Sequence, residues 1–240
     1  MDNLFYFFVN KLYFCYHTNI KMTESQELII EKTMEFVKQE LSNSEGGHDW
    51  WHIYRVLNTS IYIAKEESAD VFVVQLAALL HDIADPKFHY GNEEIGPKLV
   101  YNFLIEIGVD MEIITHVIAI IRNMSFKNTF DNIEFNSLEL DIVRDADRLD
   151  AIGAIGIART FNYGGFIGSE IYNPNINPKT FKSKKEYKNS KAPTINHFYE
   201  KLLLLKSMMT TKTGKKLAEN RHDFMETYLE QFYKEWNIVD

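Results

Sequence analysis

The spacing of apolar residues predicts helices along most of the chain. Apolar side chains recur every three or four positions over residues 30–41, and this stripe ends before two glycines. Asp49 is the expected N-cap of the next helix. Residues 71–83 are apolar on nearly every face until His81, which predicts a buried helix that stops before Pro86. Further helices are expected over residues 95–103, 113–124, 138–159, 194–209 and 213–236. No stretch alternates as a strand would, so the sequence predicts an all-α protein.

Residues 1–21 differ from the rest of the chain. Their apolar and aromatic runs are broken by Asn10 and Lys11, and neither approaches the roughly 20 apolar residues that span a bilayer. Met22 looks like a second start that opens directly into a helix. We expect residues 1–21 to be a dispensable extension, with a docking helix or a weak membrane anchor as the alternatives.

Helical spacing is lost between residues 162 and 193. Glycines, prolines, asparagines and lysines replace the apolar stripe for about 30 residues, which is long for a loop inside a compact domain. The expected organisation is one domain over 22–240 with 162–193 as an insertion. This insertion would be either a lid, whose lysines close over a substrate, or a solvated basic loop.

The charge and the cysteine content narrow the function. A formal net charge of −8 argues against binding nucleic acid polymers or anionic membranes. A small phosphorylated ligand remains compatible, because a bound dication reverses the local charge. Cys15 is the only cysteine, so any metal must be held by imidazole and carboxylate, and a cytoplasmic location is expected.

The first candidate site is His81-Asp82 at the end of the buried helix. A buried carboxylate is costly without a cation, and a metal ion is the natural partner. The alternative is a His–Asp hydrogen bond that only joins two helices.

The second candidate is His52, which a cap at Asp49 would place in the first helical turn, with Arg55 one turn on. An arginine beside a metal-binding histidine suits a phosphate group, although a capping histidine beside a solvated arginine would look the same. Two other His-Asp pairs, at 48–49 and 222–223, follow no apolar run and are expected to be structural.

The third candidate is a run of aspartates at 141, 145, 147 and 150 within an otherwise apolar helix, followed by the small residues Gly153, Ala154 and Gly156. Such acid density beside tightly packed small residues indicates a role in binding charge. A solvated acidic face is the alternative.

Taken together, these segments resemble the HD superfamily of metal-dependent phosphohydrolases, whose ordered pattern is H…HD…D on a helical bundle. His52 matches the first histidine, His81-Asp82 the doublet, and Asp147 the distal aspartate. Longer matches, such as Gly-His-Asp-Trp-x-His-x-x-Arg-Val, are similar to the small bacterial-type subfamily that includes nucleoside triphosphate pyrophosphohydrolases. The resemblance covers residues 23–236.

The resemblance implies one divalent ion held by His52, His81, Asp82 and Asp147, with manganese first and magnesium, nickel, iron or zinc as alternatives. Asp145 and Asp150 would support the ligands or end a helix. Asp85 would assist the water that attacks phosphorus, and the expected phosphate-binding cations are Arg55, Lys87, Arg122 and Arg148. His116 could approach the metal, but Arg122-Asn123-Met124 stands where dinuclear relatives carry further histidines, so one ion is favoured.

The expected reaction is hydrolysis of a nucleotide, most specifically a nucleoside or deoxynucleoside triphosphate to the monophosphate and pyrophosphate. A 5′-nucleotidase, a cyclic-nucleotide phosphodiesterase, a non-catalytic nucleotide-binding regulatory domain and a di-iron oxygenase are the alternatives. The expected partner is the small phosphorylated substrate, and the question of a homodimer is left open.

Overall fold

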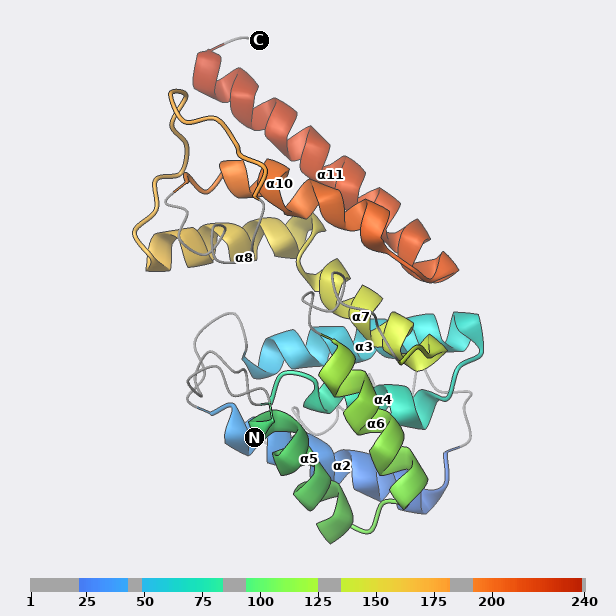
Figure 1. Ribbon diagram of the computed structural model, residues 1–240. Coiled ribbons are helices and arrows are strands. Elements are labelled where there is room, and N and C mark those ends of the chain that lie inside the picture. The colour runs from blue at the N-terminus through green and yellow to red at the C-terminus, as the bar shows by residue number, and fades with distance from the viewer. Residues whose placement is uncertain (1–21, 43–48, 84–93, 125–134, 182–191, 239–240) are drawn as a thin grey trace, which may run out of the picture.

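The computed structural model describes residues 22–42, 49–83, 94–124, 135–181 and 192–238, and the regular structure in these ranges is entirely helical (Figure 1). The predicted all-α class is confirmed. None of the described helices is long and apolar enough to cross a bilayer. Residues 1–21 lie outside the described ranges, so their dispensability stays a prediction. The elements are α2 (Glu24–Glu40), α3 (Trp50–Glu67), α4 (Val71–Leu80), α5 (Ile95–Glu106), α6 (Met111–Asn123), α7 (Leu138–Asp150), α8 (Gly153–Phe166), α10 (Asn196–Glu200), the 3₁₀ helix η3 (Leu202–Met208) and α11 (Lys212–Asn237).

Side-chain caps determine where the first helices begin. The predicted cap of α3 is confirmed, because Asp49 Oδ1 accepts a hydrogen bond of 2.9 Å from the His52 backbone N–H. Asp70 caps α4 in the same way. The Asp49 cap places His52 in the first turn of α3.

Helix α4 forms the centre of the core. Every residue of this helix is buried, and it contacts α2, α3, α6 and α7. The expected helix over 71–83 is too long, because α4 ends at Leu80 and His81 is its C-cap. His81 and Asp82 therefore lie in a turn where the buried helix ends, rather than inside it.

The prediction of a single helix over residues 138–159 is wrong. The chain breaks after α7 and restarts as α8, and Gly153 at the break has φ +73°, a left-handed conformation that favours glycine. A side chain at Gly156 would meet the Ala151 carbonyl oxygen, so the turn closes only with glycine there. Both glycines lie in the apolar run, which is why spacing alone did not reveal the break.

The C-terminal elements also differ from expectation. Helix α8 continues to Phe166, so the aperiodic stretch begins later than residue 162, and the helix expected over 194–209 is α10 followed by η3, with a break at Lys201. The two ends of the stretch after α8 are joined by a backbone hydrogen bond of 2.8 Å, which the Thr194 N–H donates to the Glu170 carbonyl oxygen. Residues 182–191, which carry most of the lysines, lie outside the described ranges, so lid closure stays a prediction.

Helix α7 connects two parts of the molecule. In Figure 1, α8, α10 and α11 form a layer on one side of α3 and α7, and α2, α4, α5 and α6 lie on the other. The fully buried Asp145 of α7 accepts hydrogen bonds from the backbone N–H groups of Thr210 and Thr211 at the start of α11. Arg148 donates to the Met208 carbonyl at the end of η3. These contacts hold the C-terminal layer against the helix that carries Asp147.

Candidate metal centre

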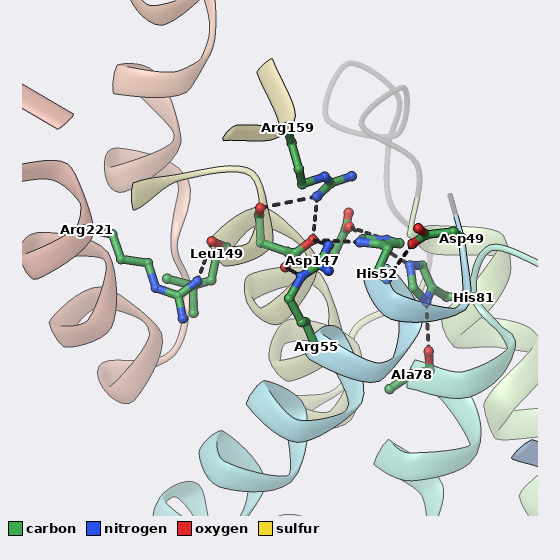
Figure 2. Close-up of polar contacts among 10 residues, drawn as sticks. Asp49, His52, Arg55, Ala78, His81, Asp147, Leu149, Arg159 and Arg221 are labelled. Atoms are coloured by element: carbon green, nitrogen blue, oxygen red, sulfur yellow. Dashed lines mark hydrogen bonds and ion pairs between the residues drawn. The ribbon is translucent and has the colours of Figure 1, made fainter. Parts of the chain in front are cut away.

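Three side chains from separate helices converge at one point. His52 comes from α3, His81 from the end of α4 and Asp147 from α7, and one ligand atom of each lies within 4.8 Å of the others (Figure 2). Asp147 Oδ1 is 3.5 Å from His52 Nε2 and 4.0 Å from His81 Nε2. Donors about 2.1 Å from a common ion lie roughly 3 to 4 Å apart, so this set fits a metal ion.

The Nδ1 atom of each histidine ring faces a hydrogen-bond acceptor. His52 Nδ1 is 2.8 Å from Asp150 Oδ2, and His81 Nδ1 is 2.9 Å from the Ala78 carbonyl oxygen. A carbonyl or an ionised carboxylate can only accept, so each Nδ1 carries the proton. In the neutral rings Nε2 then presents a lone pair toward Asp147, which is the tautomer that a metal ligand requires.

Asp150 is the support on which this arrangement depends. Its buried carboxylate accepts from His52, from Arg55 through Nε at 2.6 Å and Nη2 at 3.0 Å, and from Arg159. Burial raises the pKa of the Asp150 carboxyl, but the hydrogen bonds from His52 and Arg55 and the charge of Arg159 hold the pKa well below its usual value. Asp150 therefore stays ionised and fixes the His52 ring.

Arginines surround the C-terminal end of α7. Arg55 from α3 and Arg159 from α8 approach this end from opposite sides, and Arg221 of α11 donates to the Leu149 carbonyl (Figure 2). Cations are favourable there because the last carbonyls of a helix carry partial negative charge. Because α3, α8 and α11 each contribute one arginine, the same contacts join the two layers beside the metal ligands.

The converging atoms are open on one side. The side chains of His52 and His81 are only 2% and 5% exposed, whereas that of Asp147 is 43% exposed. A ligand can therefore approach the cluster from the Asp147 side without moving either ring.

The remaining predicted site residues have different surroundings. Among the described residues, the converging set does not include Asp82, which follows His81 in the turn after α4, so its role as a ligand stays a prediction. Asp85 and Lys87 lie outside the described ranges. Arg55 contacts Asp150, and Arg148 is 3.6 Å from Asp145 as well as bound to Met208. Phosphate binding by Arg55 and Arg148 stays a prediction.

Two more predicted residues have polar partners other than the three converging side chains. His116 Nε2 is 3.1 Å from Ser137 Oγ and 3.5 Å from Glu139 Oε2, on the α6 side of α7. Arg122 Nη2 forms an ion pair of 2.6 Å with Glu94. His116 is thus outside the converging set of described residues, and the number of metal ions stays a prediction.

Sequence reasoning missed the importance of Arg159 and Arg221. Arg159 lies nine residues after Asp150, and this spacing carries no helical signal because the chain breaks between them. Arg221 precedes the His-Asp pair at 222–223, which the structure places on α11, with His222 Nε2 3.3 Å from Glu226. An arginine in an otherwise apolar helix face was the available signal for Arg159.

Comparisons with known proteins agree with this geometry. The HD domain family matches residues 50–152, which span all three converging ligands. An HD-superfamily hydrolase from Bacillus thuringiensis is 45% identical, with a TM-score of 0.72, and the match covers 88% of this chain and 98% of that one. The Bacillus subtilis protein YpgQ is 38% identical over 211 residues, covering 88% of this chain and 95% of YpgQ. The crystal structure of YpgQ in complex with ADP matches with a TM-score of 0.70 at 37% identity, covering 88% of this chain and 96% of that one.

Proposed function

Because the chain belongs to the HD superfamily of metal-dependent phosphohydrolases, we propose that its substrate is a nucleotide. In its most specific form, the proposed reaction converts a nucleoside or deoxynucleoside triphosphate and water to the monophosphate and pyrophosphate. The observation that carries this proposal is the set of His52, His81 and Asp147, open to solvent on one side and backed by arginines.

The charges behind the ligands favour a phosphorylated substrate. Arg55 and Arg159 place two guanidinium groups around the carboxylate of Asp150, beside the cluster, in a chain whose net charge is −8. A divalent ion held by His52, His81 and Asp147 would supply Lewis acidity toward phosphate oxygens and activate water. Manganese is the proposed ion, with magnesium, nickel, iron and zinc as alternatives, and metal analysis of the purified protein decides among them.

A relative supports the nucleotide part of the proposal. YpgQ, similar to this chain over nearly its whole length, has been crystallised with ADP, a nucleotide with a diphosphate group. A 5′-nucleotidase or a cyclic-nucleotide phosphodiesterase would use the same residues, and a regulatory domain would bind the nucleotide without turnover. The position of bond cleavage separates these alternatives.

Hydrolysis in heavy-oxygen water tests where the substrate breaks. Attack at the alpha phosphorus places the label in the nucleoside monophosphate and releases unlabelled pyrophosphate. Mass spectrometry of the products checks this, with the Asp147→Ala variant as the control for contaminating activity. Label in orthophosphate, with a nucleoside or a diphosphate as co-product, would disprove the pyrophosphohydrolase reaction and favour a phosphatase.

Asp85 is proposed to accept the proton of the attacking water, because it lies four residues after His81 in the sequence, a spacing of about one helical turn. Asp85→Asn should retain the metal but slow turnover by roughly 10²–10⁴, the usual loss for a general acid–base group. Metal content and kcat are measured on the same preparation. Turnover equal to the native enzyme would remove Asp85 from the mechanism.

A further inference from the structure

Helix α8 has two apolar faces. One face packs inside the C-terminal layer: Ile157 is buried, Phe161 contacts the rings of Phe198 and Tyr228, and Gly164 lies against Thr194. A helix that borders solvent normally presents polar residues on its other face.

The other face of α8 is apolar and exposed. Ile155, Arg159, Tyr163 and Phe166 are spaced by four, four and three residues, so they lie along one side of the helix. Ile155 is 45% exposed, Tyr163 60% and Phe166 67%. Large apolar side chains exposed together in this way mark a binding surface.

Arg159 connects this exposed face to the metal centre. Its side chain extends from α8 to the end of α7, where it binds Asp150, and Asp150 holds the metal ligand His52 (Figure 2). Tyr163 and Phe166 follow Arg159 by four and seven residues, which is about 6 and 10 Å along the helix axis. The two aromatic residues therefore lie on the same side of α8 as the arginine that reaches the end of α7.

Helix α3 also carries an exposed aromatic side chain beside a metal ligand. Trp51 precedes Arg55 by one turn, is 55% exposed and directly precedes the ligand His52. Arg55 and Arg159 approach the end of α7 from opposite sides (Figure 2), and each lies one turn from an exposed aromatic residue of its own helix.

We infer that Tyr163 and Phe166 form a stacking surface for the base of a nucleotide whose phosphates are held at the metal centre. Aromatic side chains bind bases through their ring faces with little preference for one base, so the surface would accept several nucleobases. This inference rests on the proposed function for the position of the phosphates. It goes further by assigning recognition of the base to residues outside the metal centre.

The test compares ADP with inorganic pyrophosphate, because both carry a diphosphate and only ADP carries a base. Dissociation constants are measured by calorimetry on the metal-loaded full chain. In the double variant Tyr163→Ala/Phe166→Ala, the dissociation constant for ADP should rise by about 10-fold or more, while that for pyrophosphate changes less than twofold. Tyr163→Phe, which keeps a ring, should retain most of the ADP affinity.

Tyr62→Ala is the matched control, because Tyr62 is an exposed aromatic residue on α3 three turns from Trp51. It should leave both dissociation constants unchanged. Native protein that binds ADP no more tightly than pyrophosphate, or not at all, would overturn the inference. A double variant that binds ADP with native affinity would also overturn the inference. This holds even if size-exclusion chromatography shows that the double variant has an altered oligomeric state.

Failure of the proposed function has a different signature. A native chain that turns over no nucleotide, yet loses ADP affinity in the double variant, would keep the stacking surface and disprove the hydrolysis. A chain that hydrolyses nucleotides but shows equal ADP affinity in native and double-variant forms would keep the hydrolysis and disprove the surface.

Discussion

Asp147→Ala is expected to abolish both metal retention and turnover. Asp147 Oδ1 faces Nε2 of both His52 and His81, so its removal leaves two neutral donors with no described carboxylate in the converging set to balance a dication. His81→Ala should have the same effect. Metal content after gel filtration and kcat measured on one preparation check this expectation, and circular dichroism confirms that the helices remain.

Asp223→Asn is the matched control, since Asp223 is an exposed aspartate of a helix, α11, that is not in the converging set. It should keep both metal and turnover. Asp82→Ala extends the experiment to the ligand assigned only from sequence: loss of metal would make Asp82 the fourth ligand. Full metal occupancy in Asp82→Ala would restrict the ligands to His52, His81 and Asp147, and full occupancy in Asp147→Ala would overturn the site itself.

Two of the three converging side chains could be recognised from local sequence, because His52 follows a recognisable cap and His81 ends an apolar run. Asp147 is one of four aspartates in an acidic segment, and only the resemblance to a known family singled it out. The similarity to a known ordered pattern then joined positions that lie far apart along the chain. Their convergence in the structure depends on α3, α4 and α7 packing together around the buried α4.

The contacts that hold those ligands could not be predicted in the same way. Asp150 meets Arg55 across 95 residues and Arg159 across a helix break, and neither pairing leaves a periodic signal. The break itself depends on a glycine at φ +73° within an apolar run, where residue spacing alone favoured one continuous helix. Local patterns report which face is apolar, but not which residue from elsewhere will cover it.

The same limit applies to α8. An apolar residue on either side of a helix predicts burial, and only the exposed fractions of Tyr163 and Phe166 reveal that one side is left uncovered. Arg159 lies between these apolar positions and binds Asp150. That contact forms only in the folded structure, so the sequence alone does not explain the arginine.

Asp150→Asn is expected to weaken metal binding and to destabilise the fold at the same time. The substitution keeps the size of the side chain but removes the charge that His52, Arg55 and Arg159 share. Loss of the group that orients a metal-binding histidine typically lowers metal affinity by about 10- to 100-fold. Because the carboxylate is 5% exposed and the arginines are 33% and 28% exposed, we expect a loss of about 3 kcal/mol in the free energy of unfolding, the low end for a broken buried pair.

Thermal unfolding of the metal-free protein separates the two effects. A loss of about 3 kcal/mol should lower Tm by roughly 6–12 °C in a metal-free chain of this size. With metal present the difference in Tm should be larger, because the native chain binds the metal more tightly and is stabilised more by it. Asp141→Asn on the same helix is the matched control, because Asp141 interacts with Arg144 at 3.8 Å and with the Thr210 side chain, and neither contact involves His52, so its metal affinity should be native. If Asp150→Asn lowered Tm but bound metal as the native chain does, Asp150 would only join the two layers. Its hydrogen bond to Nδ1 would then not be what holds the His52 ring ready for the metal.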